Sequence, residues 1–133
     1  MTQTILVVED QEDNKQILRD LLGSVGIEIV EADNGRDALA LAARHKPDLI
    51  LMDIQLPIMD GYEATRRIKA DPALKSIPII VVTSYALSGD ETKARAAGCD
   101  AYVTKPYSPR QLLAAIRKLL PPESGPAPGK GAA

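Results

Sequence analysis

The sequence predicts an α/β domain in which helices cover both faces of a parallel β-sheet. Short apolar runs alternate with longer segments whose apolar residues recur every three or four positions, which is the pattern of a strand followed by a helix. About five such pairs follow one another, and strands that alternate with helices form parallel sheets with right-handed crossovers. Residues 1–120 are expected to form one domain, because 133 residues fall within the usual size of a single domain.

Three of the expected strands are aliphatic runs without an intervening polar residue. Such runs are typical of strands that are buried on both faces of a parallel sheet. They comprise Ile5–Val8, Leu49–Met52 and Ile79–Val82. Two weaker strands complete the set, because Ile27–Ala32 alternates only in part between apolar and polar residues, and Ala101–Thr104 is short and mixed.

Helices are expected after each of these strands, because apolar residues there recur at the spacing of one helix face. Their expected bounds are Asp13–Ser24, Gly35–His45, Tyr62–Ala70, Ser88–Ala97 and Pro109–Leu120. The inward face of the first helix is expected to comprise Ile17, Leu18, Leu21, Leu22 and Val25.

Capping signals support these helix boundaries. Ser108 precedes Pro109 and stands three residues before Gln111, a spacing that is typical of a capped helix start. Glycines readily adopt the left-handed conformation that ends a helix, and three of them lie where helices are expected to stop. These are Gly23, Gly26 and Gly98.

The composition favours a cytoplasmic protein with an aliphatic core. Hydrophobic residues make up 45% of the chain, and neither Trp nor Phe is present. At a formal net charge of −2, the chain lacks the excess of Lys and Arg by which proteins bind nucleic acids, so we expect no nucleic-acid partner. No segment approaches the ~20 apolar residues of a membrane span, so we expect no membrane partner. A single cysteine, Cys99, fits a reducing compartment.

Residues 121–133 differ in composition from the rest of the chain. They are rich in Pro and Gly and contain no aliphatic residue larger than Ala, so they cannot build a core. We expect a disordered tail and no separate output domain.

The side chains that can do chemistry gather at the ends of the expected strands. Glu9 and Asp10 follow the first strand, and Asp53 directly follows the aliphatic run of the third. Thr83 stands at the end of the fourth strand and Lys105 after the fifth. Parallel sheets of this kind bind ligands at the carboxyl ends of their strands, so these residues are expected to face one shallow pocket.

Three carboxylates that converge in one pocket would repel one another, and a divalent cation would relieve that repulsion. Mg²⁺ prefers oxygen ligands, so the sequence predicts a magnesium site. Asp10 and Asp53 could bind the metal directly, and Glu9, with its longer side chain, could act through a water molecule. The backbone carbonyl of Gln55 could complete the set of protein ligands.

A magnesium site next to Asp53 suggests phosphoryl transfer. The metal would neutralise charge on an incoming phosphoryl group, so that a carboxylate oxygen of Asp53 could attack phosphorus in line. Lys105 would supply a positive charge on the other side of that group, and Thr83 would offer a hydroxyl to a phosphoryl oxygen.

These motifs resemble the receiver domain of two-component response regulators. The resemblance covers about Thr4 to Leu120 and rests on Glu9-Asp10, Leu51-Met52-Asp53, Pro57–Gly61, Thr83 and Lys105-Pro106, in that order. It implies a flavodoxin-like, doubly wound sheet of five strands in the order 2-1-3-4-5 with five helices. It also implies that Asp53 is the phosphorylated residue, that Glu9 and Asp10 are the acidic pair for magnesium, and that the Lys105–Pro106 peptide bond is cis.

The resemblance further implies a single-domain regulator similar to those of chemotaxis and the cell cycle. The phosphoryl donor would be a phosphohistidine on a sensor histidine kinase or a histidine phosphotransfer protein. Thr83 would close onto the phosphoryl group, and Tyr102 would turn inward to fill the space that Thr83 leaves. The surface formed by the fourth helix, fifth strand and fifth helix would then bind a downstream protein target, and it often forms homodimers in this family. The resemblance places Gln55 and Tyr85 at positions that tune the lifetime of the phosphoryl group in this family.

Three other functions use a similar set of residues. A phosphohydrolase of the haloacid dehalogenase type has an Asp nucleophile, but it needs a second Asp two residues later, where this chain has Gln55. A flavodoxin-type flavin site holds a phosphate after the first strand, where Glu9 and Asp10 would repel it. A receiver-like module that binds partners without being phosphorylated is the third alternative. We therefore expect a phosphoacceptor that acts in signalling rather than an enzyme.

Overall fold

The computed structural model describes residues 3–83 and 90–120, which form five strands alternating with five helices. The strands are β1 (Thr4–Val8), β2 (Glu28–Ala32), β3 (Leu49–Asp53), β4 (Ile79–Thr83) and β5 (Ala101–Thr104). The helices are α1 (Glu12–Ser24), α2 (Gly35–His45), α3 (Gly61–Ala70), α4 (Asp90–Ala97) and α5 (Pro109–Leu119).

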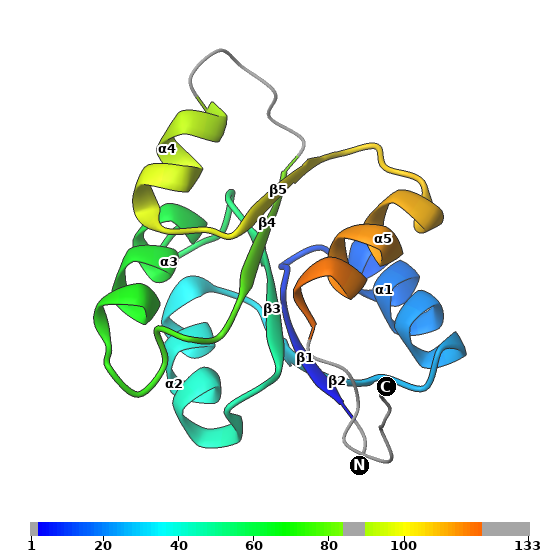
Figure 1. The fold of residues 1–133 in the computed structure, drawn as a ribbon, viewed down its shortest axis with the longest axis horizontal. Coiled ribbons are helices and arrows are strands. Elements are labelled where there is room, and N and C mark those ends of the chain that lie inside the picture. Colours follow the sequence, from blue (N-terminus) through cyan, green and yellow to red (C-terminus); the bar gives the residue numbers. More distant parts are fainter. Residues whose placement is uncertain (1–2, 84–89, 121–133) are drawn as a thin grey trace.

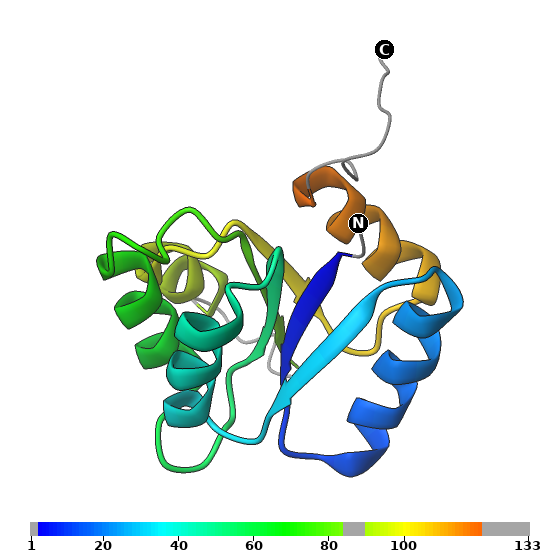
Figure 2. The ribbon, with the colours of Figure 1, turned by 90° about the horizontal axis from the view of Figure 1, so that it is seen from below.

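The five strands form one parallel sheet in the order β2-β1-β3-β4-β5. Figure 1 shows α1 and α5 on one face of the sheet and α2, α3 and α4 on the other, and Figure 2 shows the same layers from below. This arrangement confirms the predicted flavodoxin-like fold. The strand order reverses between β1 and β3, so the carboxyl ends of these two central strands are where a ligand is expected to bind.

Aliphatic side chains of the central strands fill both layers of the core. Successive residues of a strand point to opposite faces, and every residue of β3 and β4 is buried. The layer under α1 and α5 includes Ile5, Leu51, Ile80, Leu22, Leu112 and Ile116. The layer under α2, α3 and α4 includes Leu6, Met52, Val81, Ala42, Ala64 and Ile68. Each large aliphatic side chain contributes roughly 1.5–3 kcal/mol to folding by its burial.

Helix α1 buries a narrower apolar stripe than the sequence suggested. Leu18 and Leu22 are buried, but Ile17 is 54% exposed, and Val25, at the end of the helix, is also exposed. Ile17 precedes Leu18 by one position and is therefore rotated by about 100° around the helix axis, away from the sheet. The expectation that Ile17 and Val25 belong to the inward face is wrong.

The helix ends follow most of the capping signals. Gly26 and Gly98 have left-handed φ angles of 79° and 110°, as expected for glycines that end helices. Gly23 lies within α1, so its expected role as a helix stop is wrong. Ser108 Oγ accepts a hydrogen bond of 3.0 Å from the backbone N–H of Gln111, which confirms the predicted start of α5.

Some predictions concern residues outside the part of the chain that the structure describes. These are the start of the fourth helix at Ser88, the role of Tyr85 and the disordered tail at 121–133. Within the described residues, no helix is both long enough and apolar enough to cross a lipid bilayer.

Candidate functional site

Three carboxylates meet at the carboxyl ends of β1 and β3. Glu9 and Asp10 follow β1, and Asp53 is the last residue of β3. The pairing of β1 with β3 sets Val8 opposite Met52, so Glu9 comes level with Asp53. One carboxylate oxygen from each of the three acids lies within 4.8 Å of the other two. Glu9 and Asp53 are only 3% and 9% exposed, whereas Asp10 is exposed, so two of these carboxylates lie largely out of water.

Lys105 lies in the same pocket and is closer to Glu9 than to Asp53. Its Nζ is 2.9 Å from Oε1 of Glu9 and 3.5 Å from Oδ2 of Asp53. Its backbone N–H donates to the carbonyl of Thr83 at 2.7 Å, and the Lys105–Pro106 peptide bond is cis, as the resemblance implied. Burial lowers the pKa of Lys105, but the hydrogen bond to Glu9 and the charge of Asp53 outweigh burial, so the pKa is raised. Lys105 is therefore a charged counter-ion within the acidic pocket.

The two carboxylate oxygens of Asp53 have different surroundings. Oδ1 accepts hydrogen bonds from the backbone N–H groups of Ile54 (2.7 Å) and Gln55 (3.4 Å), and Oδ2 faces Lys105. Burial, and after it the charge of Glu9, raises the pKa of Asp53 to about 6, against the opposing effect of Lys105. Asp53 is thus mostly ionised at neutral pH.

A glycine holds α3 against the backbone of Asp53. The N–H of Gly61 donates to the carbonyl of Ile54 at 2.9 Å, and a Cβ on Gly61 would lie only 2.0 Å from the carbonyl oxygen of Asp53. Asp60 caps the helix, because its Oδ1 accepts a hydrogen bond of 2.9 Å from the N–H of Glu63. Asp60 and Gly61 therefore begin α3 and bring it into contact with the site. Gly61 is part of the motif Pro57–Gly61, but nothing in the sequence indicated this close approach.

The loop between β3 and α3 contains a strained turn at Ile58. The N–H of Met59 donates to the carbonyl of Pro57 at 2.7 Å, which closes a three-residue turn around Ile58 with a φ of 70°. Such a φ is uncommon for a β-branched residue. The carbonyl of Met59 accepts a hydrogen bond of 3.0 Å from the N–H of Gly35 and thereby fastens the loop to α2. The loop presents Ile58, which is 69% exposed, to solvent.

Thr83 and Tyr102 lie on neighbouring strands and on the same face of the sheet. The pairing of β4 with β5 sets Val81 opposite Tyr102 and Thr83 opposite Thr104. Because alternate residues share a face, Thr83 and Tyr102 both point to the layer that contains α3 and α4. Thr83 is fully buried, and Tyr102 is half-buried against the core of that layer.

Tyr107 is a residue of the pocket that the sequence reasoning missed. It is half-buried and lines a small cavity together with Glu9, Asp53 and Lys105. Burial raises the pKa of its phenol. On its outer side, Tyr107 lines an apolar groove beside Lys105, together with Asn14, Ile17 and Pro106. The one signal available in the sequence was its position directly after Lys105-Pro106.

The donor set suits a hard divalent cation. Glu9, Asp10 and Asp53 offer only carboxylate oxygens, which Mg²⁺ prefers over the nitrogen and sulfur ligands of transition metals. Within the pocket, three carboxylates face one ammonium, that of Lys105, so negative charge is in excess. The residues present therefore fit a magnesium ion.

Comparison with known proteins places the chain in a family. Residues 5–117 match the profile of the family described as response regulator receiver domain. The chain belongs to the response regulator receiver family. This receiver is 45% identical over 120 residues to the polar-differentiation response regulator DivK of Brucella anthropi, and equally to that of Brucella ovis. Each match covers 90% of this chain and 98% of the relative.

Solved receiver structures share the fold of this receiver. A response regulator of Chloroflexus aurantiacus matches with a TM-score of 0.86 at 28% identity, covering 90% of this chain and 98% of the other. The receiver domain of a sensor histidine kinase of Pseudomonas aeruginosa matches with a TM-score of 0.83 at 36% identity, with the same coverage. That domain has a magnesium ion coordinated in its active-site cleft.

Proposed function

We propose that this receiver acts as a single-domain response regulator that accepts a phosphoryl group on Asp53. The donor is a phosphohistidine on a sensor histidine kinase or a histidine phosphotransfer protein, and the reaction takes place in the cytoplasm with Mg²⁺ as cofactor. The observation that carries the proposal is the setting of Asp53, with Oδ1 held by backbone N–H groups and Oδ2 turned toward Lys105. Each protein molecule takes up one phosphoryl group, so the receiver acts in signalling rather than as an enzyme.

The transfer forms an O–P bond and breaks an N–P bond. Oδ2 of ionised Asp53 attacks phosphorus in line, and the electron pair of the N–P bond returns to the imidazole of the donor. Asp10, Asp53 and the backbone carbonyl of Gln55 would hold Mg²⁺, with Glu9 acting through a water molecule, and the ion would supply positive charge against the phosphoryl oxygens. Charge-assisted hydrogen bonds from Lys105 and the hydroxyl of Thr83 bind those oxygens on the protein side.

Phosphorylation then alters the surface through Thr83 and Tyr102. These two side chains point to the same layer from adjacent strands, so a movement of Thr83 toward the phosphoryl group changes the space next to Tyr102. The phosphoryl group shifts the population of states only by its different affinity for each of them. A Thr83→Ala variant that still changed its partner binding fully on phosphorylation would contradict this coupling.

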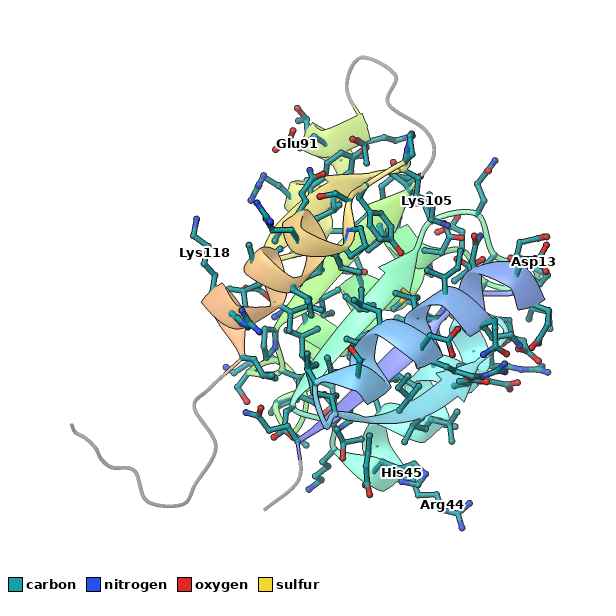
Figure 3. The ribbon with its side chains drawn as sticks, turned by 90° about the vertical axis from the view of Figure 1, so that its right-hand side faces the viewer. Asp13, Arg44, His45, Glu91, Lys105 and Lys118 are labelled. Atoms are coloured by element: carbon teal, nitrogen blue, oxygen red, sulfur yellow. The ribbon has the colours of Figure 1, made fainter. Side chains whose placement is uncertain are left out.

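The donor and the target dock on different parts of the receiver. The apolar groove of Ile17, Pro106 and Tyr107 adjoins Lys105, so it suits a phosphodonor protein. A second hollow runs along β5 between α4 and α5 and includes Tyr102, Arg95 and Lys118. We place the downstream target, or a second copy of the receiver, on this face. Figure 3 shows Lys105 and Lys118 well apart, near opposite ends of α5, so the two docking sites need not overlap.

The experiment that tests the function measures the intact mass of the protein after incubation with acetyl phosphate and Mg²⁺. A gain of one phosphoryl group in the parent, labile to alkali and absent from Asp53→Asn, is expected. Omission of Mg²⁺ in the presence of EDTA is expected to abolish the gain. If the parent gains nothing, a binding module that works without phosphorylation is favoured instead. If Asp53→Asn gains as much as the parent, another residue takes up the phosphoryl group, and Asp53 is not the acceptor.

A further inference from the structure

The turn between β2 and α2 (residues 32–35) is joined to both loops that carry the acidic pocket. On one side, the backbone N–H of Glu9 donates to the carbonyl of Ala32 at 3.0 Å. On the other side, the backbone N–H of Gly35 donates at 3.0 Å to the carbonyl of Met59, in the loop between β3 and α3. The turn therefore connects the two segments that supply the proposed ligands of Mg²⁺, although none of its residues belongs to the carboxylate cluster.

The start of α2 is fixed in place by its cap and by the core. Oδ1 of Asn34 accepts a hydrogen bond of 2.8 Å from the backbone N–H of Asp37, and Nδ2 of Asn34 donates to Oδ2 of Asp37 at 3.1 Å. Asn34 and Gly35 are buried, and Ala38 and Ala42 pack in the core beneath the helix. Because packed interiors yield little, the first turn of α2 is a firm support for the loop that it contacts.

Gly35 leaves no room for a side chain next to that loop. A Cβ on Gly35 would lie 2.3 Å from the carbonyl oxygen of Met59 and 3.0 Å from its carbonyl carbon. Both are backbone atoms, so the clash could be relieved only by a movement of the loop or of the helix. Gly35 does not have a left-handed φ, so the close approach of Met59, and not the conformation of the backbone, requires a glycine here.

The loop between β3 and α3 is compact and connects Met59 closely to Gln55. The N–H of Leu56 donates to the carbonyl of Ile54 at 3.0 Å, which closes a three-residue turn around Gln55, and a second such turn ends at Met59. The N–H of Gly61 donates to the same carbonyl of Ile54 at 2.9 Å. Two tight turns leave the chain little slack, so a displacement of the Met59 carbonyl would also move the backbone at Gln55.

We propose that Gly35 is a positioning residue for the metal site, because its close contact with Met59 determines where the loop presents the carbonyl of Gln55. The inference rests on the proposed magnesium site, in which that carbonyl is a ligand. Mg²⁺ demands near-octahedral geometry, whereas Ca²⁺ tolerates more irregular arrangements of its ligands. Displacing the carbonyl should therefore weaken the binding of Mg²⁺ more than the binding of Ca²⁺.

Titration calorimetry with Mg²⁺ and, separately, with Ca²⁺ tests this inference in the parent and in Gly35→Ala. The dissociation constant for Mg²⁺ is expected to rise about tenfold in the variant, as it does when residues that support metal ligands are changed. The dissociation constant for Ca²⁺ is expected to rise by less than about threefold. A general loss of stability would affect both cations alike, so equal factors for the two cations, or an unchanged affinity for Mg²⁺, would overturn the inference.

Two further variants serve as matched controls. Gly23→Ala adds a Cβ within α1, where it meets no other part of the described structure within 4 Å. Asn34→Ala removes the cap of α2 and is expected to lower stability, but it adds no atom next to Met59. Both are expected to keep the ratio of the two dissociation constants within about twofold of that of the parent. If Asn34→Ala changed this ratio as much as Gly35→Ala does, the stability of α2, and not the contact with Met59, would control the metal site.

Hydrogen exchange in the parent gives a test that does not depend on a variant that folds. If Gly35 and the cation hold the same loop, each stabilises the contact of the other, because coupling between two binding events is reciprocal. Saturation with Mg²⁺ is therefore expected to slow exchange of the Gly35 amide by more than about threefold. The amide of Lys46, which donates to the carbonyl of Ala42 at the other end of α2, should exchange as before.

The possible failures of the inference and of the proposed function can be told apart. Equal exchange of the Gly35 amide with and without Mg²⁺ would overturn the positioning role. That result would leave the labelling of Asp53 by acetyl phosphate intact. A parent that binds no Mg²⁺ and takes up no phosphoryl group would instead contradict the proposed function itself, and the positioning role with it.

Discussion

Replacing Asp53 by Asn should raise the free energy of unfolding at neutral pH. Asp53 is 9% exposed and lies beside Glu9, and burial and that neighbouring charge together raise the pKa of its carboxylate to about 6. An Asn has the same shape but no charge, and its Oδ1 can still accept the hydrogen bond from the N–H of Ile54. Lys105 keeps its nearer partner, Glu9, so the variant leaves the ammonium with a counter-ion.

The sign and the size of the effect follow from the two pKa values of Asp53. In the unfolded chain its pKa is about the ordinary 3.8, so the unfolded state loses this proton first as the pH rises. The free energy of unfolding therefore falls between about pH 4 and pH 6 and stays low above pH 6. A difference of about 2.2 between the two pKa values corresponds to at most about 3 kcal/mol. Screening by water at the mouth of the pocket reduces this to about 1–2 kcal/mol.

Urea denaturation of the parent and Asp53→Asn, from pH 4 to pH 8 in EDTA, measures the effect. The two proteins are expected to be similarly stable near pH 4 and to diverge as the pH rises, with Asp53→Asn the more stable. Asp20→Asn, which removes an exposed carboxylate on α1, serves as the control and should show no such divergence. A difference that does not change with pH, or an Asp53→Asn variant less stable than the parent at pH 7.5, would refute the reasoning.

Three further substitutions test the surroundings of the site by urea denaturation. Gly61→Ala is expected to lower the free energy of unfolding by about 1–3 kcal/mol and to reduce labelling by acetyl phosphate, because its Cβ would lie 2.0 Å from the carbonyl oxygen of Asp53. Unchanged stability and labelling would show that α3 can move away freely. Ile58→Asn is expected to raise the free energy of unfolding by about 1 kcal/mol, because Asn tolerates a φ of 70° better than a β-branched residue does. Ile58→Val keeps the strain, and equal stability of these two variants would contradict that cause. Thr65→Val is expected to raise the free energy of unfolding by about 1 kcal/mol, because the buried hydroxyl of Thr65 has no hydrogen-bond partner among the described residues. A lower free energy of unfolding in the variant would mean that the hydroxyl does have a partner.

The sheet could be predicted from the sequence because its central strands are continuous apolar runs. Those runs became β1, β3 and β4, and the helices between them fixed the parallel direction and the two layers. The apolar spacing of the first helix was a poorer guide to which side chains are buried. It identifies the apolar residues near one helix face, but it does not show how much of that face the sheet covers. Ile17 fits the spacing and is nevertheless exposed, where it lines the groove beside Lys105.

The convergence of Glu9, Asp10 and Asp53 could also be predicted, because it follows from the topology of the strands alone. Whether Lys105 pairs more closely with Glu9 or with Asp53 could not be predicted, because that depends on how the side chains reach across the pocket. The distance from Nζ of Lys105 is 2.9 Å to Glu9 and 3.5 Å to Asp53, a difference of only 0.6 Å. Residue type and strand order say which charges meet. Which of these charged groups pair depends on the positions of their atoms.

Several features that the sequence did not predict lie close to Asp53, and some of them lower the stability of the fold. They belong to one segment, which comprises the end of β3, the loop that follows and the start of α3. They are the buried charge of Asp53, the positive φ of Ile58 and the close packing of Gly61 against the backbone of Asp53. Local sequence preferences predict structures that satisfy them, so they fail where a segment adopts a costly conformation. For the buried charge of Asp53, a cation in the pocket would offset the cost, because positive charge next to Asp53 stabilises the ionised form that burial opposes.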